Sequence, residues 1–83
     1  MHVKVLQHHI DRGERGNAFH CPIAQALREQ FPDVEKVSVG SVIYVGENKV
    51  GGTPQDAAEW ICAFDRGKHV EPFEFDIVPI FPE

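Results

Sequence analysis

The sequence predicts a small α+β domain, residues 1–83, in which two helices cover one face of an antiparallel sheet. Two segments have apolar residues at helical spacing, and each begins next to a proline, at Pro22 and at Pro54. A third segment, residues 72–78, alternates apolar with acidic side chains, as a half-buried strand does. The predicted order of elements is β-α-β-β-(β)-α-β, which favours an antiparallel sheet with its helices on one side.

The first part of the chain is predicted to hold one strand and one helix. Residues 3–6 alternate weakly between apolar and polar side chains and indicate a short strand. Residues 8–17 are polar and contain two glycines, so we expect a surface loop with room for a single helical turn. A helix is expected over about residues 22–31, with Cys21 or His20 as its cap. Its buried face carries Ile23, Ala26, Leu27 and Phe31.

The middle of the chain predicts a run of short strands. Residues 37–39 alternate, and residues 42–45 are β-branched or aromatic, which is typical of a central strand. Turns are expected at residues 40–41 and 46–48, where Gly, Ser and Asn occur. A short third strand is expected at residues 49–50.

The second helix, about residues 54–66, has the clearest start signal in the chain. Thr53 is a natural cap, and Asp56 follows it at the spacing of a capping box. Gly67 is expected to end the helix, and the last strand covers residues 72–78. The side chains expected to be buried are Ala57, Trp60, Ile61 and Phe64 in the helix, and Phe73, Phe75 and Ile77 in the strand.

The balance of charge restricts the class of partner. The chain carries 13 Asp and Glu residues against 8 Lys and Arg, a formal net charge of −5. This charge disfavours phosphate backbones and anionic membranes, so neither nucleic acid nor a membrane is expected as a direct partner. No run of residues approaches the roughly 18 apolar residues of a membrane span, and the start of the sequence does not resemble a signal peptide. Two cysteines do not make a disulfide framework. We therefore expect a cytoplasmic protein.

Acidic residues gather in two parts of the sequence. Residues 71–83 contain four acids and no Lys or Arg, and Glu74 and Asp76 should share the outer face of the last strand, about 7 Å apart. The second group, Glu29, Asp33 and Glu35, lies where the first helix is expected to end. If the two groups meet in space, they form a negative face suited to a basic groove that normally holds nucleic acid. The alternative is a solvated face that only limits aggregation. The candidate partner-binding residues are Glu29, Asp33, Glu35, Glu71, Glu74 and Asp76.

Four residues near the first helix have side chains that ligate zinc: His8, His9, His20 and Cys21. They form two adjacent pairs, and neighbours in an extended chain point apart. Neither C-x2-C nor H-x3-H spacing is present, so no metal site is predicted. The glycine-bearing loops match neither a phosphate-binding nor a dinucleotide-binding fingerprint, and no cofactor is expected.

Thiol chemistry at Cys21 is the other catalytic possibility. A thiolate at a helix N-terminus is stabilised by unpaired N–H groups, and His20 is adjacent in sequence. A Cys-His enzyme also needs a third group to orient the histidine and a site for an oxyanion. We therefore expect Cys21 to be a cap or a core thiol and Cys62 to be a core residue, with no catalytic residue in the chain.

Several short motifs occur together: Ile10-Asp11-Arg12-Gly13, Cys21-Pro22-Ile23-Ala24 with Ala26-Leu27, Val37-x-Val39-Gly40, Phe64-Asp65-Arg66-Gly67, and Val70-x-Pro72-Phe73-x-Phe75. In these the chain resembles a group of short, mostly uncharacterised proteins of bacteriophages and actinobacterial mobile elements. The resemblance covers most of the chain, and its most specific part is Cys-Pro-Ile-Ala-x-Ala-Leu. In size, charge and expected origin the chain is also similar to anti-CRISPR proteins. These proteins bind a Cas effector and block either its access to DNA or its conformational change.

The resemblance implies a host-interaction protein. The leading expectation is a small acidic inhibitor of a bacterial defence complex, such as CRISPR-Cas, that binds stoichiometrically and presents carboxylates in place of nucleic-acid phosphates. Its partner would be a Cas effector subunit with a basic nucleic-acid groove. Two alternatives stay open: a metal- or thiol-dependent small regulator or enzyme that uses His8, His9, His20 and Cys21, and a phage accessory or structural protein.

Overall fold

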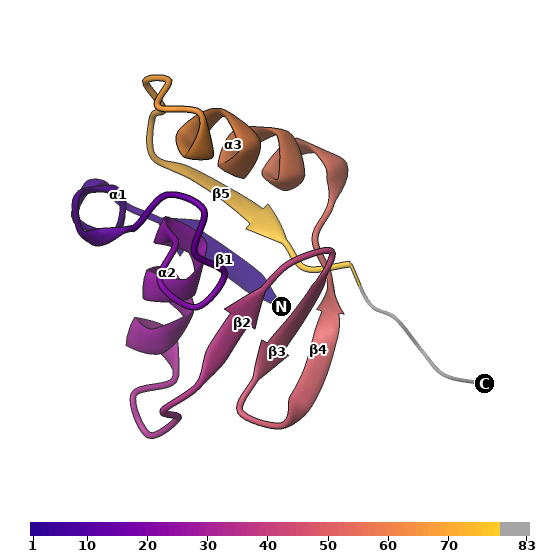
Figure 1. The fold of residues 1–83 in the computed structure, drawn as a ribbon. Coiled ribbons are helices and arrows are strands. Elements are labelled where there is room, and N and C mark those ends of the chain that lie inside the picture. The colour runs from indigo at the N-terminus through magenta and orange to yellow at the C-terminus, as the bar shows by residue number, and fades with distance from the viewer. Residues whose placement is uncertain (79–83) are drawn as a thin grey trace.

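The computed structural model describes residues 1–78 and confirms the α+β class and the predicted order of elements (Figure 1). One helix is added to those predicted, between the first strand and the helix that starts at Pro22. No helix in the described part of the chain is both long and apolar enough to cross a membrane. The elements are β1 His2–Val5, α1 Gln7–Arg12, α2 Pro22–Gln30, β2 Val37–Val39, β3 Val42–Val45, β4 Asn48–Gly52, α3 Gln55–Asp65 and β5 Phe73–Asp76.

The strands form two antiparallel sheets where one was expected. β1 pairs with β5, and β2, β3 and β4 form a meander. The two sheets meet at one bridge, where Gly52 and Val78 exchange main-chain hydrogen bonds of 2.7 and 3.0 Å. Gly51 has a φ of 153°, and a Cβ there would lie 2.5 Å from the Val78 carbonyl oxygen, so this close approach requires glycine.

The helix α1 occupies residues that the sequence predicts to be a loop with room for one turn. Its first turn is closed by the Leu6 carbonyl, which accepts from the amides of His9 and Ile10 at 3.0 and 3.2 Å. The Leu6 amide in turn donates to His9 Nδ1 at 2.9 Å, so a histidine takes the position that Glu or Gln has in a usual capping box. A single apolar residue, Ile10, gave the sequence too little periodicity to indicate this helix.

Both longer helices contact the inner face of the β1–β5 sheet. Residues directly opposite each other in the ladder point to the same side, so Val3 and Val5 share this face with Phe75 and Phe73. The buried apolar side chains of α2 join Val3 and Val5 in one core, and the Trp60 ring of α3 stacks on Phe73 with centroids 4.4 Å apart. In Figure 1, α3 runs alongside β5 and α2 lies beside β1, with the meander below.

The predicted core is confirmed in α2 from Ile23 to Leu27, and only partly confirmed at Phe31, in α3 and in β5. Ile23, Ala26, Leu27, Ala57, Phe64, Phe75 and Ile77 are buried, whereas Phe31, Trp60, Ile61 and Phe73 are half-buried. The Trp60 indole N–H donates to the Glu71 carbonyl at 2.9 Å, which holds the ring at the edge of the core. A two-stranded sheet is too narrow to cover both helices completely, so the outer aromatic residues keep contact with water.

Two predictions about α3 were wrong. Cys62 is exposed because it lies two residues before the buried Phe64, roughly 200° around the helix from it. Thr53 does not cap the helix: Pro54 occupies the cap position, and the Thr53 hydroxyl donates to the Gly40 carbonyl at 2.5 Å. At α2 the prediction was correct, since the Cys21 sulfur accepts from the Ala24 amide at 3.4 Å.

Leu27 is completely buried between α2 and the strands, so its truncation tests the core directly. We expect Leu27→Ala to lower the free energy of unfolding by about 2–5 kcal/mol, as measured by urea denaturation. Leu6→Ala is the matched control, because 45% of Leu6 is exposed, and it should cost less than about 0.5 kcal/mol. Equal losses in the two variants would contradict the position of Leu27 in the core.

Candidate functional site

The two acidic side chains of β5 lie on the outer face of the β1–β5 sheet, beside a histidine of β1. Glu74 and Asp76 are exposed, as the alternation of the strand predicts, and Asp76 lies opposite His2. The two His2 ring nitrogens lie 2.8 Å from Asp76 Oδ1 and 2.6 Å from Glu74 Oε1. Only a protonated imidazole donates through both nitrogens, so these bonds, to Asp76 first and then to Glu74, raise the pKa of His2.

This outer face therefore has mixed charge and is less acidic than the sequence suggests. Residues 71–83 contain no Lys or Arg, but the paired strand places Lys4 opposite Glu74, on the same face as His2. The sequence could not reveal this pairing, because His2 and Asp76 are 74 positions apart in the chain.

A second group of histidines surrounds Glu29, which is exposed near the end of α2. His8 Nε2 lies 2.9 Å from Glu29 Oε2, and His9 Nε2 lies 3.1 Å from Glu29 Oε1. The hydrogen bonds from His8 and then from His9 lower the pKa of Glu29. One carboxylate thus joins α1 to α2. The prediction that His8 and His9 point apart assumed an extended chain and was wrong. Both residues lie in the helix α1, and their ring centroids are 4.0 Å apart.

His8, His9 and Glu29 are also the one group in the described residues whose donor atoms could jointly hold a metal ion, since those atoms all lie within 4.8 Å of one another. The hydrogen bonding around His9 argues against such an ion. His9 Nδ1 accepts from the Leu6 amide, so the proton of neutral His9 is assigned to Nε2, which donates to Glu29. A metal at Nε2 would need the opposite tautomer and would break the bond that starts α1.

The other candidate pair for metal or thiol chemistry, His20 and Cys21, does not act together. Cys21 is buried, and burial raises the pKa of its thiol, so it stays neutral near pH 7. His20 Nδ1 instead lies 2.9 Å from Arg28 Nη1. The expectation that Cys21 is a cap and core thiol is confirmed. No hydrogen bond within the described residues joins His20 to Cys21 in the manner of a nucleophile and its base.

A groove of about 370 Å³ between β1 and α2 connects the two histidine-carboxylate groups. His2 and Lys4 form one wall, and Glu29 with His9 forms the other. Of the six predicted partner-binding acids, Glu29 lines this groove, and Glu74 and Asp76 are hydrogen-bonded to His2, which also lines it. The lining residues are His2, Lys4, Leu6, His9, Ala26, Glu29 and Gln30.

Within the described part of the chain, the remaining three predicted acids neither line this groove nor form a hydrogen bond with a residue that lines it. Glu71 is exposed and is hydrogen-bonded to His69 in the segment that follows α3. Asp33 and Glu35 are exposed in the connection between α2 and β2. A further acid of the terminal group, Glu83, lies outside the described residues.

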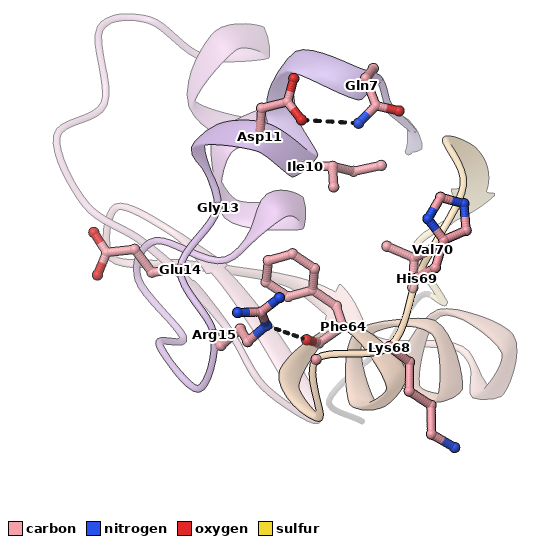
Figure 2. Close-up of a pocket in the computed structure, with 11 residues that line it drawn as sticks. Gln7, Ile10, Asp11, Gly13, Glu14, Arg15, Phe64, Lys68, His69 and Val70 are labelled. Atoms are coloured by element: carbon pink, nitrogen blue, oxygen red, sulfur yellow. Dashed lines mark hydrogen bonds between the residues drawn. The ribbon is translucent and has the colours of Figure 1, made fainter.

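A larger depression, of about 680 Å³, lies between α1 and the segment that follows α3 (Figure 2). Ile10, Phe64 and Val70 supply its apolar side chains. Arg15 crosses one side, where its Nε donates to the Phe64 carbonyl at 3.2 Å and its guanidinium lies 5.7 Å from the Phe64 ring centroid. The sequence reading of residues 8–17 as an ordinary loop missed this depression, because the residues that form it come from both ends of the chain.

Asp11, Glu14 and Arg15, which line this depression, already have hydrogen-bond partners within the chain. Figure 2 shows the Gln7 amide donating to Asp11 across its rim, at 3.0 Å, while Glu14 and Lys68 point away from its centre. Asp65 next to it accepts from the Gly16 amide at 2.8 Å. These contacts hold the segment before α2 against the end of α3, so we assign the depression a structural role.

Comparisons with known proteins do not add to this geometry. No protein-family model matches the chain, and neither a curated protein nor a solved structure matches it. The resemblance to proteins of phages and mobile elements therefore stays a prediction from the sequence. The arrangement of side chains is the basis for inferring function.

The raised pKa of His2 has a defined effect on stability. The ordinary pKa of histidine, 6.5, applies to the unfolded chain, so the stabilisation is fully present below about pH 6.5 and is lost as the pH rises through the higher folded value. We expect an NMR titration to give His2 a pKa above 6.5, and Glu74→Gln with Asp76→Asn to return it towards 6.5. A His2 pKa at or below 6.5 in the unaltered chain would exclude the double hydrogen bond.

The hydrogen bonding of His9 predicts that the fold does not need a metal ion. We expect a strong chelator to leave the melting temperature unchanged, and equimolar zinc to leave it unchanged as well, as measured by thermal unfolding followed by circular dichroism. A rise in melting temperature with zinc that disappears in Glu29→Gln would instead establish a site at His8, His9 and Glu29.

Proposed function

We propose that the chain acts by binding a partner protein stoichiometrically, through Glu29 in the groove between β1 and α2 and through Glu74 and Asp76, which His2 links to that groove. The observation that supports this proposal is the convergence of two acidic groups that are distant in sequence. Glu29 lies in α2 and lines the groove, while Glu74 and Asp76 lie in β5 and are hydrogen-bonded to His2, which lines the same groove. A cluster of carboxylates at the rim of a groove favours a partner with Arg and Lys side chains.

These carboxylates are held in place before any partner arrives. Each accepts a hydrogen bond from a histidine: Glu29 from His8 and His9, and Glu74 and Asp76 from His2. Acceptor groups with fixed positions lose less side-chain entropy on binding than free ones, which favours affinity. The histidines are thus interpreted as positioning groups for the acids.

The expected partner class follows from the resemblance described for the sequence. A basic groove that normally holds nucleic acid would accept these carboxylates in place of phosphates, and occupation of that groove would inhibit a defence complex such as a Cas effector. A phage accessory or structural protein would use the same surface with a different partner, so the identity of the partner separates these two possibilities.

A metal-dependent regulator is the second candidate function. The close approach of the donor atoms of His8, His9 and Glu29 favours it. Its ligands would then include Glu29, in place of the His20 and Cys21 that the sequence suggested. The hydrogen bond from the Leu6 amide to His9 is the observation against it.

The inhibitor proposal is tested in a bacterium whose CRISPR-Cas system targets a phage. Expression of the chain should raise the plating efficiency of that phage, and the purified chain should elute together with the effector complex at a fixed stoichiometry. Unchanged plating together with no co-elution, for each effector type tried, would contradict a role as an inhibitor of these complexes. Co-elution with capsid or tail proteins instead would support the accessory role.

Neutral replacements test the contribution of the acids once a partner is captured. We expect Glu74→Gln with Asp76→Asn to weaken binding by about threefold to thirtyfold, because each exposed ion pair contributes roughly 0.3–1 kcal/mol. The matched control is Glu47→Gln with Glu59→Gln, two exposed acids in the β3–β4 turn and on α3. Asp56 is unsuitable as a control, because its carboxylate accepts from the Ala57 amide at the start of α3.

Salt gives an independent measure of the same contribution. Binding by the unaltered chain should weaken between 0.1 M and 1 M salt, as the screening length falls from about 10 Å to about 3 Å. The neutral double variant should be less sensitive to salt. Equal affinities for the double variant and its control would leave the acids a purely solubilising role.

A further inference from the structure

The β1 strand has a free main-chain edge. The Ile77 amide donates to the Met1 carbonyl at 2.8 Å, which fixes the phase of the antiparallel ladder. Val3 and Val5 are therefore the residues of β1 that exchange main-chain bonds with β5, and the amides and carbonyls of His2 and Lys4 point away from it. No described residue pairs with these four groups of His2 and Lys4.

The groove described above adjoins this strand. Its lining includes His2 and Lys4 of β1 on one side and Ala26, Glu29 and Gln30 of α2 on the other. This groove of about 370 Å³ therefore lies between a strand with unpaired main-chain groups and a helix wall, on the side of β1 where an added strand would sit at the normal inter-strand spacing of about 4.8 Å.

The charges around this groove define the side chains that an added strand should carry. Residues opposite His2 and Lys4 would point to the outer face, where Glu74 and Asp76 lie, and the residue between them would point towards α2 and Glu29. Lys4 and the protonated form of His2 lie among three carboxylates at this place. Arg or Lys side chains on both sides of the added strand would therefore find acceptors.

We propose that the partner contributes an extended basic segment that lies in this groove and adds as a strand to the edge of β1. Its main chain pairs with the amides and carbonyls of His2 and Lys4, and its Arg or Lys side chains pair with Glu29 on one side and with Glu74 and Asp76 on the other. This inference rests on the proposed function and names the form in which the partner binds. Four main-chain groups give a short ladder, so the charge pairs supply the rest of the affinity.

The Lys4 amide provides a selective test, because the β1–β5 ladder does not use it. Lys4→Pro removes this donor at an edge position where proline is tolerated, and Lys4→Thr removes the same charge while keeping the donor. The probe is a capped peptide with three consecutive Arg residues between Thr residues, which places Arg on both faces of the added strand, and its control has Glu in place of each Arg. We expect Lys4→Pro to bind the Arg peptide about tenfold more weakly than Lys4→Thr, and neither variant to bind the Glu peptide.

Two measurements on the unaltered chain do not depend on the folding of a variant. Saturating Arg peptide should slow hydrogen exchange at the amides of His2 and Lys4 by at least about tenfold. Two peptides should be compared, one methylated on the odd-numbered amides and the other on the even-numbered amides. One set of methyl groups should abolish binding and the other should not, because only one side of the added strand pairs with β1. Unchanged exchange at these two amides, or equal binding of both methylated peptides, would overturn strand addition.

The outcomes also separate this inference from the proposed function. If the neutral variant of Glu74 and Asp76 weakens binding but Lys4→Pro and Lys4→Thr bind alike, the acidic surface is used and strand addition is wrong. If the neutral variant binds as well as its control, the proposed function itself fails. Self-association of the chain that Lys4→Pro abolishes would assign the edge to a second copy of the chain and overturn the inference.

Discussion

The antiparallel pairing of β1 with β5 is the contact on which the remaining structure depends. It joins the first strand to the last, so almost the whole chain is closed into one loop, and the entropy of that closure has to be offset by what the pairing buries. On its inner face the pairing brings Val3 and Val5 beside Phe75, and α2 and α3 pack against them. On its outer face the same register sets His2 between two carboxylates.

The histidines extend this coupling from the core to the surface. His9 is 3% exposed and connects the Leu6 amide, at the start of α1, with Glu29 in α2. The side chain that begins one helix therefore also orients the carboxylate of the next. Because these bonds satisfy both ring nitrogens, the same residue is well suited to positioning an acid and poorly suited to holding a metal.

The features that the sequence predicted depend on local patterns. Apolar spacing gave α2 and α3, and strict alternation placed Glu74 and Asp76 on the outer face of β5, because the period of a helix or strand is written in consecutive residues. The pairing of these acids with His2 depends on register between distant strands, which no local pattern encodes. The helix α1 was missed because its one apolar residue gives no periodicity, and its start is stabilised by a bond from the Leu6 amide to the His9 side chain, which the sequence pattern does not show.

The β1–β5 ladder also determines how the fold responds to mechanical load. The bond between Met1 and Ile77 lies at the end of the ladder where both strands leave the sheet, and the Gly52–Val78 bridge lies just beyond it. A force that pulls Met1 and Val78 apart acts across the strands, so the hydrogen bonds break one after another and do not share the load. The domain should therefore open at low force. The ladder would unzip from the end at Met1 and Ile77, and the helices would be released once β1 has separated from β5.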